Sequence, residues 1–586
     1  MNPVSIVGYT LRGAAGFLLM AAGLPAAAQD FRTIDGDVNN LTNLNWGSVG
    51  RLLSRQAGVN YADGISSVDG ARANPREVSN AVFQHTGSIQ DARKLSEFNW
   101  IWGQFISHDI SHTLAGPSNG TLGITIPNAD PFFGPQGLGG QSLTMNRSDF
   151  VLDGGSRQQV NNISGWIDAN TVYGGRATDG PAGTDRADWL RSFSGGKLRV
   201  SNSAVGDLMP LTEAGAPVMA NQNVPTMGAS TFVAGDVRAN EHVGLLSMHT
   251  LFVREHNRLA DVIASADATL DDEQIFQRAR KIVGAQMAAV TYNEYLPSLG
   301  IQLGAYTGYD PAVNPDVTNE FSTAAFRLGH SQINNTIQRL DAPGGNPIAE
   351  GNLDIVDAFF NPSEIYNGGL EGIFNGLRFS RQEATDAVLV DGLRNQLFER
   401  FIPGVGLVTD GSDLASLNIM RGRDHGLATF NDTREAYGLA RIDNWSDLTS
   451  NAGLQTALAS VYGSIDEMDL WVGMLAQDHM SNASVSETVA VILAEQFERL
   501  RAADRFWFEH DLFGVNSDLI DPVAAFDGTN LTTASEWLST LTLGELLTLN
   551  TNGVYSGNVF FIPAPGASLA LAAGGLLAAR RRRRSA

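Results

Sequence analysis

The amino-acid sequence predicts a mainly α-helical protein that forms one large domain with long loops and little β-structure. Amphipathic patterns with the helical period recur along the chain, whereas the alternation of apolar and polar residues that is typical of strands is scarce. The chain also has no internal repeat and no long linker. The longest helical patterns cover residues 243–265, 272–297, 317–332, 387–400, 411–423 and 484–505.

The segments between these patterns differ in composition. Residues 29–90 are rich in turn-forming sequences, and we expect them to form an extended arm. Residues 114–160 and 174–230 are rich in Gly, Pro, Asn and Ser, which predicts mostly loop structure. Loops this long in a compact domain usually carry function.

Composition excludes several kinds of function. With 586 residues, of which 43% are hydrophobic, the chain can bury a large core. Its net charge of −23 argues against a nucleic-acid partner, because phosphate binding needs a basic surface. The sequence contains no cysteine. Disulfides, zinc–thiolate sites, thiolate-ligated haem and thiol catalysis are therefore excluded.

Both ends of the chain resemble export segments. Arg12 precedes a short apolar run that ends in an Ala26-x-Ala28 site, so we expect residues 1–28 to be a secretory signal peptide. Residues 561–586 combine a Pro-Ala-Pro turn, an apolar stretch and the cluster Arg580–Arg584, and they resemble a bacterial exosortase-type sorting signal. Arginines after an apolar helix indicate transient membrane retention during sorting. We therefore expect a folded domain over 29–560, in a protein that is secreted or held at the cell surface.

The first predicted helix contains an unusual set of polar residues. The segment from Trp100 to Thr113 is apolar and aromatic, yet it includes Gln104, His108, Asp109 and His112. Gln104 and His108 are four residues apart and share one helical face, which His112 would extend.

Taken alone, these residues allow two interpretations. His108 and His112 have the spacing of the two histidines in H-E-x-x-H zinc helices, although no glutamate lies between them. Alternatively, they are ordinary histidines of the core or the surface.

Motifs along the whole chain favour a third interpretation. The segment "WGQFISHD" (102–109) resembles the distal-helix motif of the animal haem peroxidases. Further motifs of that family follow in the family's order, so the resemblance covers residues from about 30 to about 560. They are "RTIDGDVNN" (32–40), "SGWIDANTVYG" (164–174), "AGDVRANE" (234–241) with "SMHTLFVREHNRLA" (247–260), "AFRLGHSQI" (325–333), and "LNIMRGRDHGL" (417–427) with "AEQFERLRAADRFWFE" (494–509).

The resemblance implies a haem b cofactor and a set of residues that hold it. His330 would be the axial ligand of the iron. Asn418 would accept the hydrogen bond of its imidazole N–H and so set the basicity of the ligand. Arg327 and Arg421 would pair with the haem propionates, because a guanidinium group suits a carboxylate.

The same resemblance implies a peroxidase reaction. Gln104 and His108 would face the open side of the iron, where His108 takes a proton from hydrogen peroxide and returns it to the leaving oxygen. Arg238 would stabilise the negative charge that develops as the O–O bond breaks. The resulting ferryl haem radical would oxidise a halide, a pseudohalide or a small organic donor.

A calcium ion is also implied. Calcium prefers hard oxygen ligands, which Asp109 and the loop of residues 164–174 would provide. The ligands would be the side chains of Asp109, Ser164, Asp168 and Asn170 and the carbonyl group of Trp166.

The chain departs from the family at the covalent links to haem. Family members usually have a carboxylate before the distal histidine and another three residues after the catalytic arginine, and both form esters with the haem. Here Ser107 occupies the first position and Glu241 the second, so one ester bond is possible. His242 follows Glu241, which excludes a methionine sulfonium link. Fewer links imply a lower haem potential, which favours iodide, bromide, thiocyanate or organic donors over chloride.

Two alternative functions remain. Fatty-acid dioxygenases of the same superfamily place a radical-forming tyrosine three residues before the proximal histidine, where this chain has Arg327. The second alternative is a non-catalytic surface or matrix protein that retains the fold. The presence of His108, Arg238, His330 and Asn418 argues against that alternative.

Overall fold

Helices dominate the structure, as the sequence predicts: 41% of the residues are helical and 11% are in strands. The computed structural model describes residues 31–175, 185–220, 230–397, 400–402, 406–408, 411–510 and 534–563. The predicted signal peptide and almost all of the predicted sorting signal lie outside the described residues. Within the described part, no helix combines the length and the apolar character that crossing a bilayer requires.

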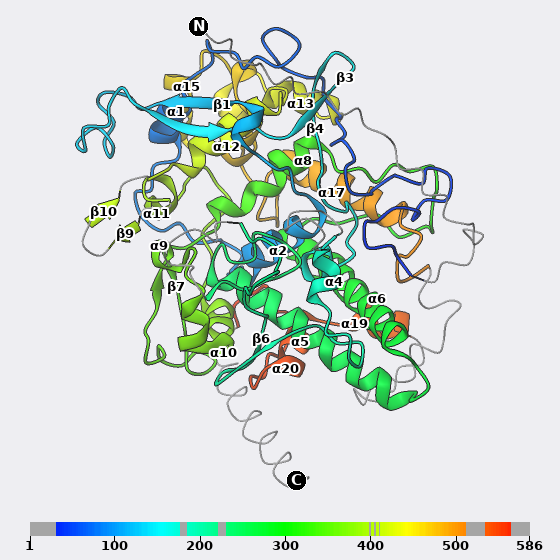
Figure 1. Ribbon diagram of the computed structural model, residues 1–586. Helices are drawn as coiled ribbons and strands as arrows, with labels where there is room; N and C mark the ends of the chain where they lie inside the picture. The colour runs from blue at the N-terminus through cyan, green and yellow to red at the C-terminus, as the bar shows by residue number, and fades with distance from the viewer. Residues whose placement is uncertain are drawn as a thin grey trace, which may run out of the picture.

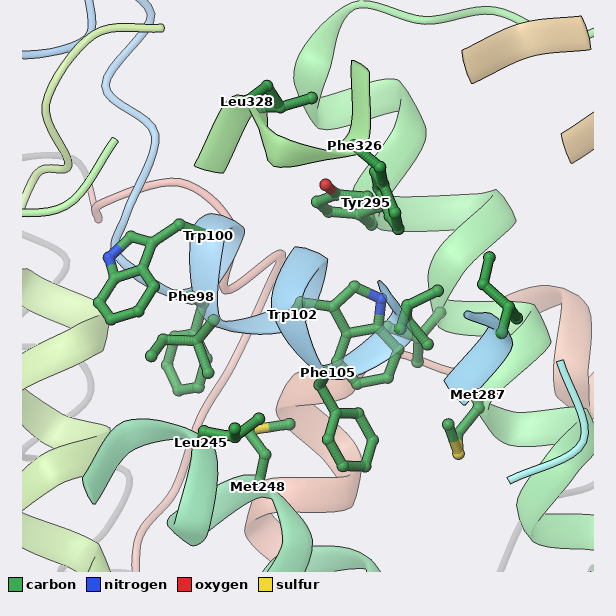
Figure 2. Packing of buried hydrophobic residues seen from close by; sticks show 14 of the residues in the cluster. Phe98, Trp100, Trp102, Phe105, Leu245, Met248, Met287, Tyr295, Phe326 and Leu328 are labelled. Atoms are coloured by element: carbon green, nitrogen blue, oxygen red, sulfur yellow. The ribbon is translucent and has the colours of Figure 1, made fainter. Parts of the chain in front are cut away.

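Helix α2 (Phe98–Ile110) lies near the centre of the molecule (Figure 1). It is enclosed by helix α5 (Val243–Ala266) on one side and by the 3₁₀ helix η5 (Ala325–Ser331) on the other (Figure 2). The ring of Phe105 stacks on that of Phe252 of α5, with ring centroids 5.2 Å apart. Aromatic burial of this kind contributes strongly to core stability and fixes the position of the central helix.

Two long helices were predicted, of which α5 packs against α2 and α6 (Asp272–Val290) packs against α5. Helix α5 corresponds to the pattern at 243–265. Helix α6 begins at a capping box formed by Asp271 and Gln274, which satisfies backbone donors that would otherwise be unpaired. It continues through a π-helical turn, η4 (Thr291–Tyr295), into α7 (Leu296–Leu299). Together these elements cover the pattern at 272–297.

The C-terminal patterns are partly confirmed. Helices α12 (Leu414–Asp424) and α17 (Glu487–Ala502) match the patterns at 411–423 and 484–505. Each begins at a side chain that caps backbone amides, Asp413 for α12 and Ser486 for α17.

Two predicted helices were wrong in extent. The pattern at 317–332 is divided into α8 (Asn319–Thr323) and η5, because Ala324 leaves helical geometry with φ −126° and ψ −69°. Among the described residues of the pattern at 387–400, which exclude 398 and 399, only α11 (Asp391–Arg394) is helical. Its N-cap, Val390, makes no side-chain hydrogen bond to the first turn.

The expected extended arm at 29–90 also contains a helix, α1 (Pro75–Val82). Pro75 lies in its first turn and Asn74 caps it, a combination that starts helices efficiently. The remaining helices are short or lie outside the predicted patterns: α3 (Asn170–Tyr173), α4 (Arg186–Leu190), α9 (Ile355–Ala358), α10 (Ser363–Phe379), α13 (Phe430–Ala436), α14 (Trp445–Leu448), α15 (Ala452–Val461), α16 (Leu470–Ala476), α19 (Ala534–Thr540), α20 (Leu543–Asn550), and the 3₁₀ turns η2 (Pro117–Asn119) and η6 (Ile465–Glu467).

Strands in the described part of the chain form only two-stranded antiparallel sheets. Two of these hairpins lie in the segment 114–160, which was predicted to be loop. The pairs are β1 (Thr121–Thr125) with β2 (Ser142–Asn146), β3 (Phe150–Asp153) with β4 (Ser156–Gln159), β5 (Ser201–Ser203) with β6 (Gly206–Leu208), β7 (Thr336–Ile337) with β8 (Leu353–Asp354), and β9 (Arg400–Ile402) with β10 (Gly406–Val408).

Candidate active site

One face of the central helix is less completely buried than the rest. Eleven of the thirteen residues of α2 are buried, and the two exceptions are Gln104 and Ser107. Together with His108 they occupy positions i, i+3 and i+4, which form a single face. We call these three residues the uncovered face of α2. Gln104 and Ser107 are thus partly exposed although the helix lies near the centre of the molecule (Figure 1).

His112 does not extend this face, contrary to the prediction. Helix α2 ends at Ile110, and Ser111 is already extended, with φ −148° and ψ 133°. The backbone amide of His112 instead donates to Asn161. Among the described residues, no three His, Cys, Asp or Glu side chains are grouped so that they could hold a metal ion. The zinc interpretation of His108 and His112 is therefore unsupported.

Arg238 is held at the end of α2 by Asp236, a residue that sequence reasoning missed. Nε and Nη2 of Arg238 donate to the two carboxylate oxygens of Asp236 at 2.9 and 2.6 Å. Nη2 also donates to the carbonyl oxygen of Ser111 at 3.2 Å. A cation beside helix-terminal carbonyl groups is favourable. The only sequence signal for Asp236 was its place within "AGDVRANE".

His108 lies beside the same carboxylate. Its Nδ1 is 3.6 Å from Oδ1 of Asp236, which is too long for a good hydrogen bond, and it has no other partner among the described residues. Burial lowers the pKa of His108 well below 6.5, and the nearby charge of Arg238 lowers it further. The imidazole is therefore neutral near pH 7 and can accept a proton. Burial alone would raise the pKa of Asp236, but the charge of Arg238 lowers it below its usual value, so Asp236 stays ionised.

Gln104 connects the uncovered face to the start of α5. Its Nε2 donates to Oε2 of Glu241 at 2.8 Å, and its Oε1 lies 2.7 Å from Nε2 of His242. Burial raises the pKa of Glu241 to about 7, although the charge of Arg238 opposes this shift. The carboxyl group of Glu241 is therefore near half-ionisation at neutral pH. His242 was noted from the sequence only as a residue that cannot form a sulfonium link.

Arg327 and His330 lie on η5, and the 3₁₀ geometry of this helix sets the relative positions of their side chains. A 3₁₀ helix has three residues per turn, so residues three positions apart are aligned. Both side chains consequently reach the same residue, Asn418 of α12. Nη1 of Arg327 donates to Oδ1 of Asn418 at 3.1 Å, and Nδ2 of Asn418 is 2.7 Å from Nδ1 of His330. Burial lowers the pKa of His330 to about 3, so the ring is neutral.

Arg421 lies on α12, one helical turn beyond Asn418. Its Nη1 donates to Asp424, to Ser148 and to the carbonyl oxygen of Asn146, at 2.9, 2.8 and 3.0 Å. Arg421 also lowers the pKa of Arg327, although burial is the larger cause of that shift, to about 10. The two cations thus lie close together, although Arg421 is also paired with the carboxylate of Asp424.

The α2 side and the η5 side of the site are adjacent. The charge of Arg327 opposes the rise in the pKa of Glu241, and the charge of Arg238 contributes to the lowered pKa of Arg327. A Cβ atom added at Gly329 would lie 3.8 Å from Cβ of Trp100 on α2. The structure therefore brings Gln104, His108, Arg238, Glu241, His330 and Asn418 into one region.

A second polar cluster lies behind His108. Asp109 is fully buried, and its carboxylate accepts the backbone amides of Asp168, Ala169 and Thr171 at 3.2, 3.2 and 2.9 Å. The loop adopts this shape because Ala169 has the left-handed φ of 63°. Burial, and then the neighbouring carboxylate of Asp168, raise the pKa of Asp109 well above its usual value. Two buried carboxylates that face each other would be stabilised by a cation.

The other predicted ligands surround this pair. Ser164 donates from Oγ to Oδ2 of Asp168 at 2.8 Å. Nδ2 of Asn170 is buried without a hydrogen-bond partner in the described part of the chain. The two ends of an asparagine amide have nearly the same shape, so the opposite orientation would place an oxygen there. The cluster therefore offers oxygen atoms of the kind that calcium prefers.

The sequence of this chain is also similar to those of known proteins. The family model described as animal haem peroxidase matches residues 31–517. Peroxinectin A of Dictyostelium discoideum is 35% identical over 496 residues, covering 82% of this chain and 89% of that protein. Thyroid peroxidase of Sus scrofa is 33% identical, covering 82% of this chain and 57% of that protein.

Solved structures give a consistent result. Peroxidase A from Dictyostelium discoideum superposes with a TM-score of 0.79 at 33% identity, covering 91% of this chain and 100% of that chain. The Oryza sativa fatty acid alpha-dioxygenase superposes with a TM-score of 0.73 at 20% identity, covering 92% of this chain and 88% of that chain. At that identity the second likeness concerns the fold alone.

Proposed function

Because this chain belongs to the animal haem peroxidase family and is a haem peroxidase, we propose that His108, Arg238 and His330 are its principal active-site residues. The observation that carries this assignment is the uncovered face of α2 next to a neutral His330 that is oriented by Asn418. One side of the site can thus bind iron, and the other can move a proton.

The residues on the η5 side fit the haem group. When bound, the haem supplies the iron at which hydrogen peroxide is reduced and through which the donor is oxidised. His330 would ligate the iron through Nε2, which requires a proton on Nδ1 and an acceptor beside it. Asn418 meets this need if its amide presents Oδ1 to His330. Arg327 then loses its partner on Asn418 and, with Arg421, is available for the propionates.

The residues on the α2 side fit the peroxide chemistry. A neutral His108 can take the proton of the bound peroxide and return it to the departing oxygen as water forms. Arg238 stabilises the negative charge that develops on that oxygen, and Asp236 keeps its guanidinium in place. Gln104 adds an amide group on the same face of α2. These side chains are already in place before the substrate binds, so they need little rearrangement during the reaction.

Dioxygenase activity is less consistent with the site. The three-residue spacing before His330 places Arg327 where the dioxygenases carry a tyrosine. Arg327 cannot form a tyrosyl radical, and its proposed role is to pair with a haem propionate. The structural likeness to fatty acid alpha-dioxygenases supports only the shared fold.

The proposal includes one covalent haem link and a limited range of donors. Glu241 has the only carboxylate among the two ester positions, since the other is Ser107. An ester through Glu241 would form after exposure to peroxide. With at most one link, we propose iodide, bromide, thiocyanate or small organic molecules as donors in preference to chloride.

We also propose a calcium ion between α2 and the loop of residues 164–170. Asp109, Ser164, Asp168, Asn170 and the Trp166 carbonyl would hold it. The buried carboxylate pair and the unpartnered Asn170 amide support this site.

Export is proposed from the sequence alone. Residues 1–28 would direct secretion, and residues 561–586 would engage a sorting system at the membrane. Detection of the tagged protein outside intact cells, and its loss there when residues 1–28 are deleted, would test this.

The central assignment is tested by two variants of the purified protein. His330→Ala should lose most of its haem or change the haem absorption spectrum, because the axial ligand is removed. His108→Ala should keep its haem but react with hydrogen peroxide about 10²–10⁴ times more slowly. An unaltered spectrum in the first variant, or a wild-type peroxide reaction in the second, would overturn the corresponding role.

The ester is tested separately. Acid extraction after peroxide treatment should release haem completely from Glu241→Gln and only in part from the wild type. Complete release from the wild type would exclude the ester without affecting the roles of His108 and His330.

A further inference from the structure

His242 is fixed in an apolar environment at the N-cap of α5, directly before Val243. The ring is 3% exposed and lies between two aromatic rings, with its centroid 5.1 Å from that of Trp100 and 6.0 Å from that of Phe359. It also caps the helix, because its Nδ1 accepts the backbone N–H of Leu245 at 3.1 Å. A buried polar side chain in such surroundings requires hydrogen-bond partners for both ring nitrogens.

The cap determines which nitrogen carries the proton. Nδ1 accepts from Leu245, so in the neutral ring the proton is on Nε2. Burial lowers the pKa of His242 to about 3, which keeps the ring neutral at physiological pH. Nε2 is therefore a donor, and it donates to Oε1 of Gln104 at 2.7 Å.

This bond decides the orientation of the Gln104 side chain. With Oε1 bound to His242, the amide nitrogen of Gln104 donates one hydrogen to Oε2 of Glu241 at 2.8 Å and retains a second N–H. The reversed amide would place its nitrogen against the Nε2–H of His242, which is a contact between two donors. It would also place its oxygen against the carboxyl group of Glu241. The first contact is unfavourable whatever the charge of Glu241, and the second is unfavourable when Glu241 is ionised, so His242 selects the observed orientation.

We propose that His242 is a positioning residue for the peroxidase reaction. It fixes the side chain of Gln104 so that one amide N–H faces Glu241 and the other faces the rest of the uncovered face of α2. This inference rests on the proposed roles of Gln104 and Glu241, and it assigns a role to His242 that neither the motifs nor the comparisons give. The N–H group of Gln104 that remains can donate to bound peroxide. The bond to Oε2 holds the Glu241 carboxyl group in one direction.

The experiment uses haem-loaded full-length protein with four variants. His242→Phe keeps a ring between Trp100 and Phe359 but removes both hydrogen bonds. His242→Gln keeps an amide that can donate to Gln104. Gln104→Leu removes the residue that is positioned, and the double variant His242→Phe/Gln104→Leu completes a double-mutant cycle. The measured quantities are the rate constant for reaction with hydrogen peroxide and the affinity of the ferric haem for cyanide.

His256→Phe is a matched control. His256 is another buried histidine of α5, and it too has two hydrogen bonds, to the Tyr173 hydroxyl and the Gly196 carbonyl. The effect of His256→Phe measures the cost of removing a buried imidazole that lies away from Gln104.

We expect His242→Phe to bind haem normally but to lose roughly 3- to 10-fold in both quantities, the effect of one misplaced hydrogen bond. The double variant should lose no more of either quantity than Gln104→Leu alone. His242→Gln should recover most of the rate constant and the affinity. His256→Phe should match the wild type in both. Additive losses in the double variant, or wild-type values in His242→Phe, would overturn the role of His242. A wild-type protein that fails to react with peroxide would instead overturn the proposed function itself.

Discussion

The side-chain amide of Asn418 lies 2.7 Å from Nδ1 of His330 and also accepts a hydrogen bond from Arg327. One residue of α12 thus contacts two residues of η5 that are three positions apart. Turning the amide oxygen of Asn418 to His330, as the proposed iron ligand requires, would therefore release Arg327 toward the haem edge.

Replacing Asn418 should change the properties of the haem without removing its ligand. Asn418→Ala leaves the His330 N–H without an acceptor, so we expect haem affinity to fall about 10-fold or more and the reduction potential to rise. Asn418→Asp provides a stronger acceptor and should lower the potential below that of the wild type. Haem titration and spectroelectrochemistry measure both effects.

Asn375→Ala is a suitable control for these variants. Asn375 is a buried asparagine of α10 that donates to the carbonyl oxygen of Leu340, away from the site. Equal potentials in both Asn418 variants and this control would contradict the role of Asn418.

Asp236 should be needed for the action of Arg238. Arg238→Ala removes the cation that stabilises the developing charge, and we expect the peroxide reaction to slow by about 10²–10³. Asp236→Asn keeps the cation but removes its charged partner, so a smaller loss of about 10-fold is expected. Rapid-mixing absorbance measurements give both rates. If Asp236→Asn slows the reaction equally in the presence and absence of Arg238, the two residues do not act together.

Removal of the proposed calcium ion should destabilise α2. Asp168→Ala leaves the Asp109 carboxylate buried without a cation, so we expect the bound calcium, the melting temperature and the haem occupancy to fall together. Elemental analysis and thermal unfolding measure these quantities, and exposed Asp153→Ala is the control. Active, haem-loaded wild-type protein without calcium would rule out this site.

The buried carboxyl group of Glu97 should make the stability depend on pH. Burial raises its pKa from 4.5 to about 8, and only its Oε1 has a hydrogen-bond partner in the described structure, the amide of Asn334. A raised pKa in the folded state gives stability that is present below pH 4.5 and is lost as the pH rises through 8. Glu97→Gln lacks this titration.

We therefore expect Glu97→Gln to gain stability relative to the wild type as the pH rises from 5 to 8, by at most about 1.4 kcal/mol per pH unit. Urea unfolding at several pH values measures the difference. Glu77→Gln, at an exposed residue of α1, should show no such trend. A stability difference between Glu97→Gln and the wild type that does not change with pH would show that Glu97 titrates normally in the folded state.

Much of the fold was predictable from local sequence. The helical periods at 243–265, 411–423 and 484–505 correspond to α5, α12 and α17, because an apolar stripe and a capping residue are both local features. The break at Ala324 was not predictable, since the period continues through it. That break produces the 3₁₀ helix that aligns Arg327 with His330.

The sequence by itself determined which residues are available to the site, since the motif spacing placed Gln104 and His108 on one face of a helix and identified His330 and Asn418. Only the tertiary structure decided how these residues are held. Gln104 and His242 are 138 positions apart, and their hydrogen bond exists because α5 packs against α2. Asp236 likewise acquires its role from the packing of its loop against the end of α2. Contacts between segments distant in sequence leave no periodic signal in either segment, so packing alone determines the orientation of a side chain.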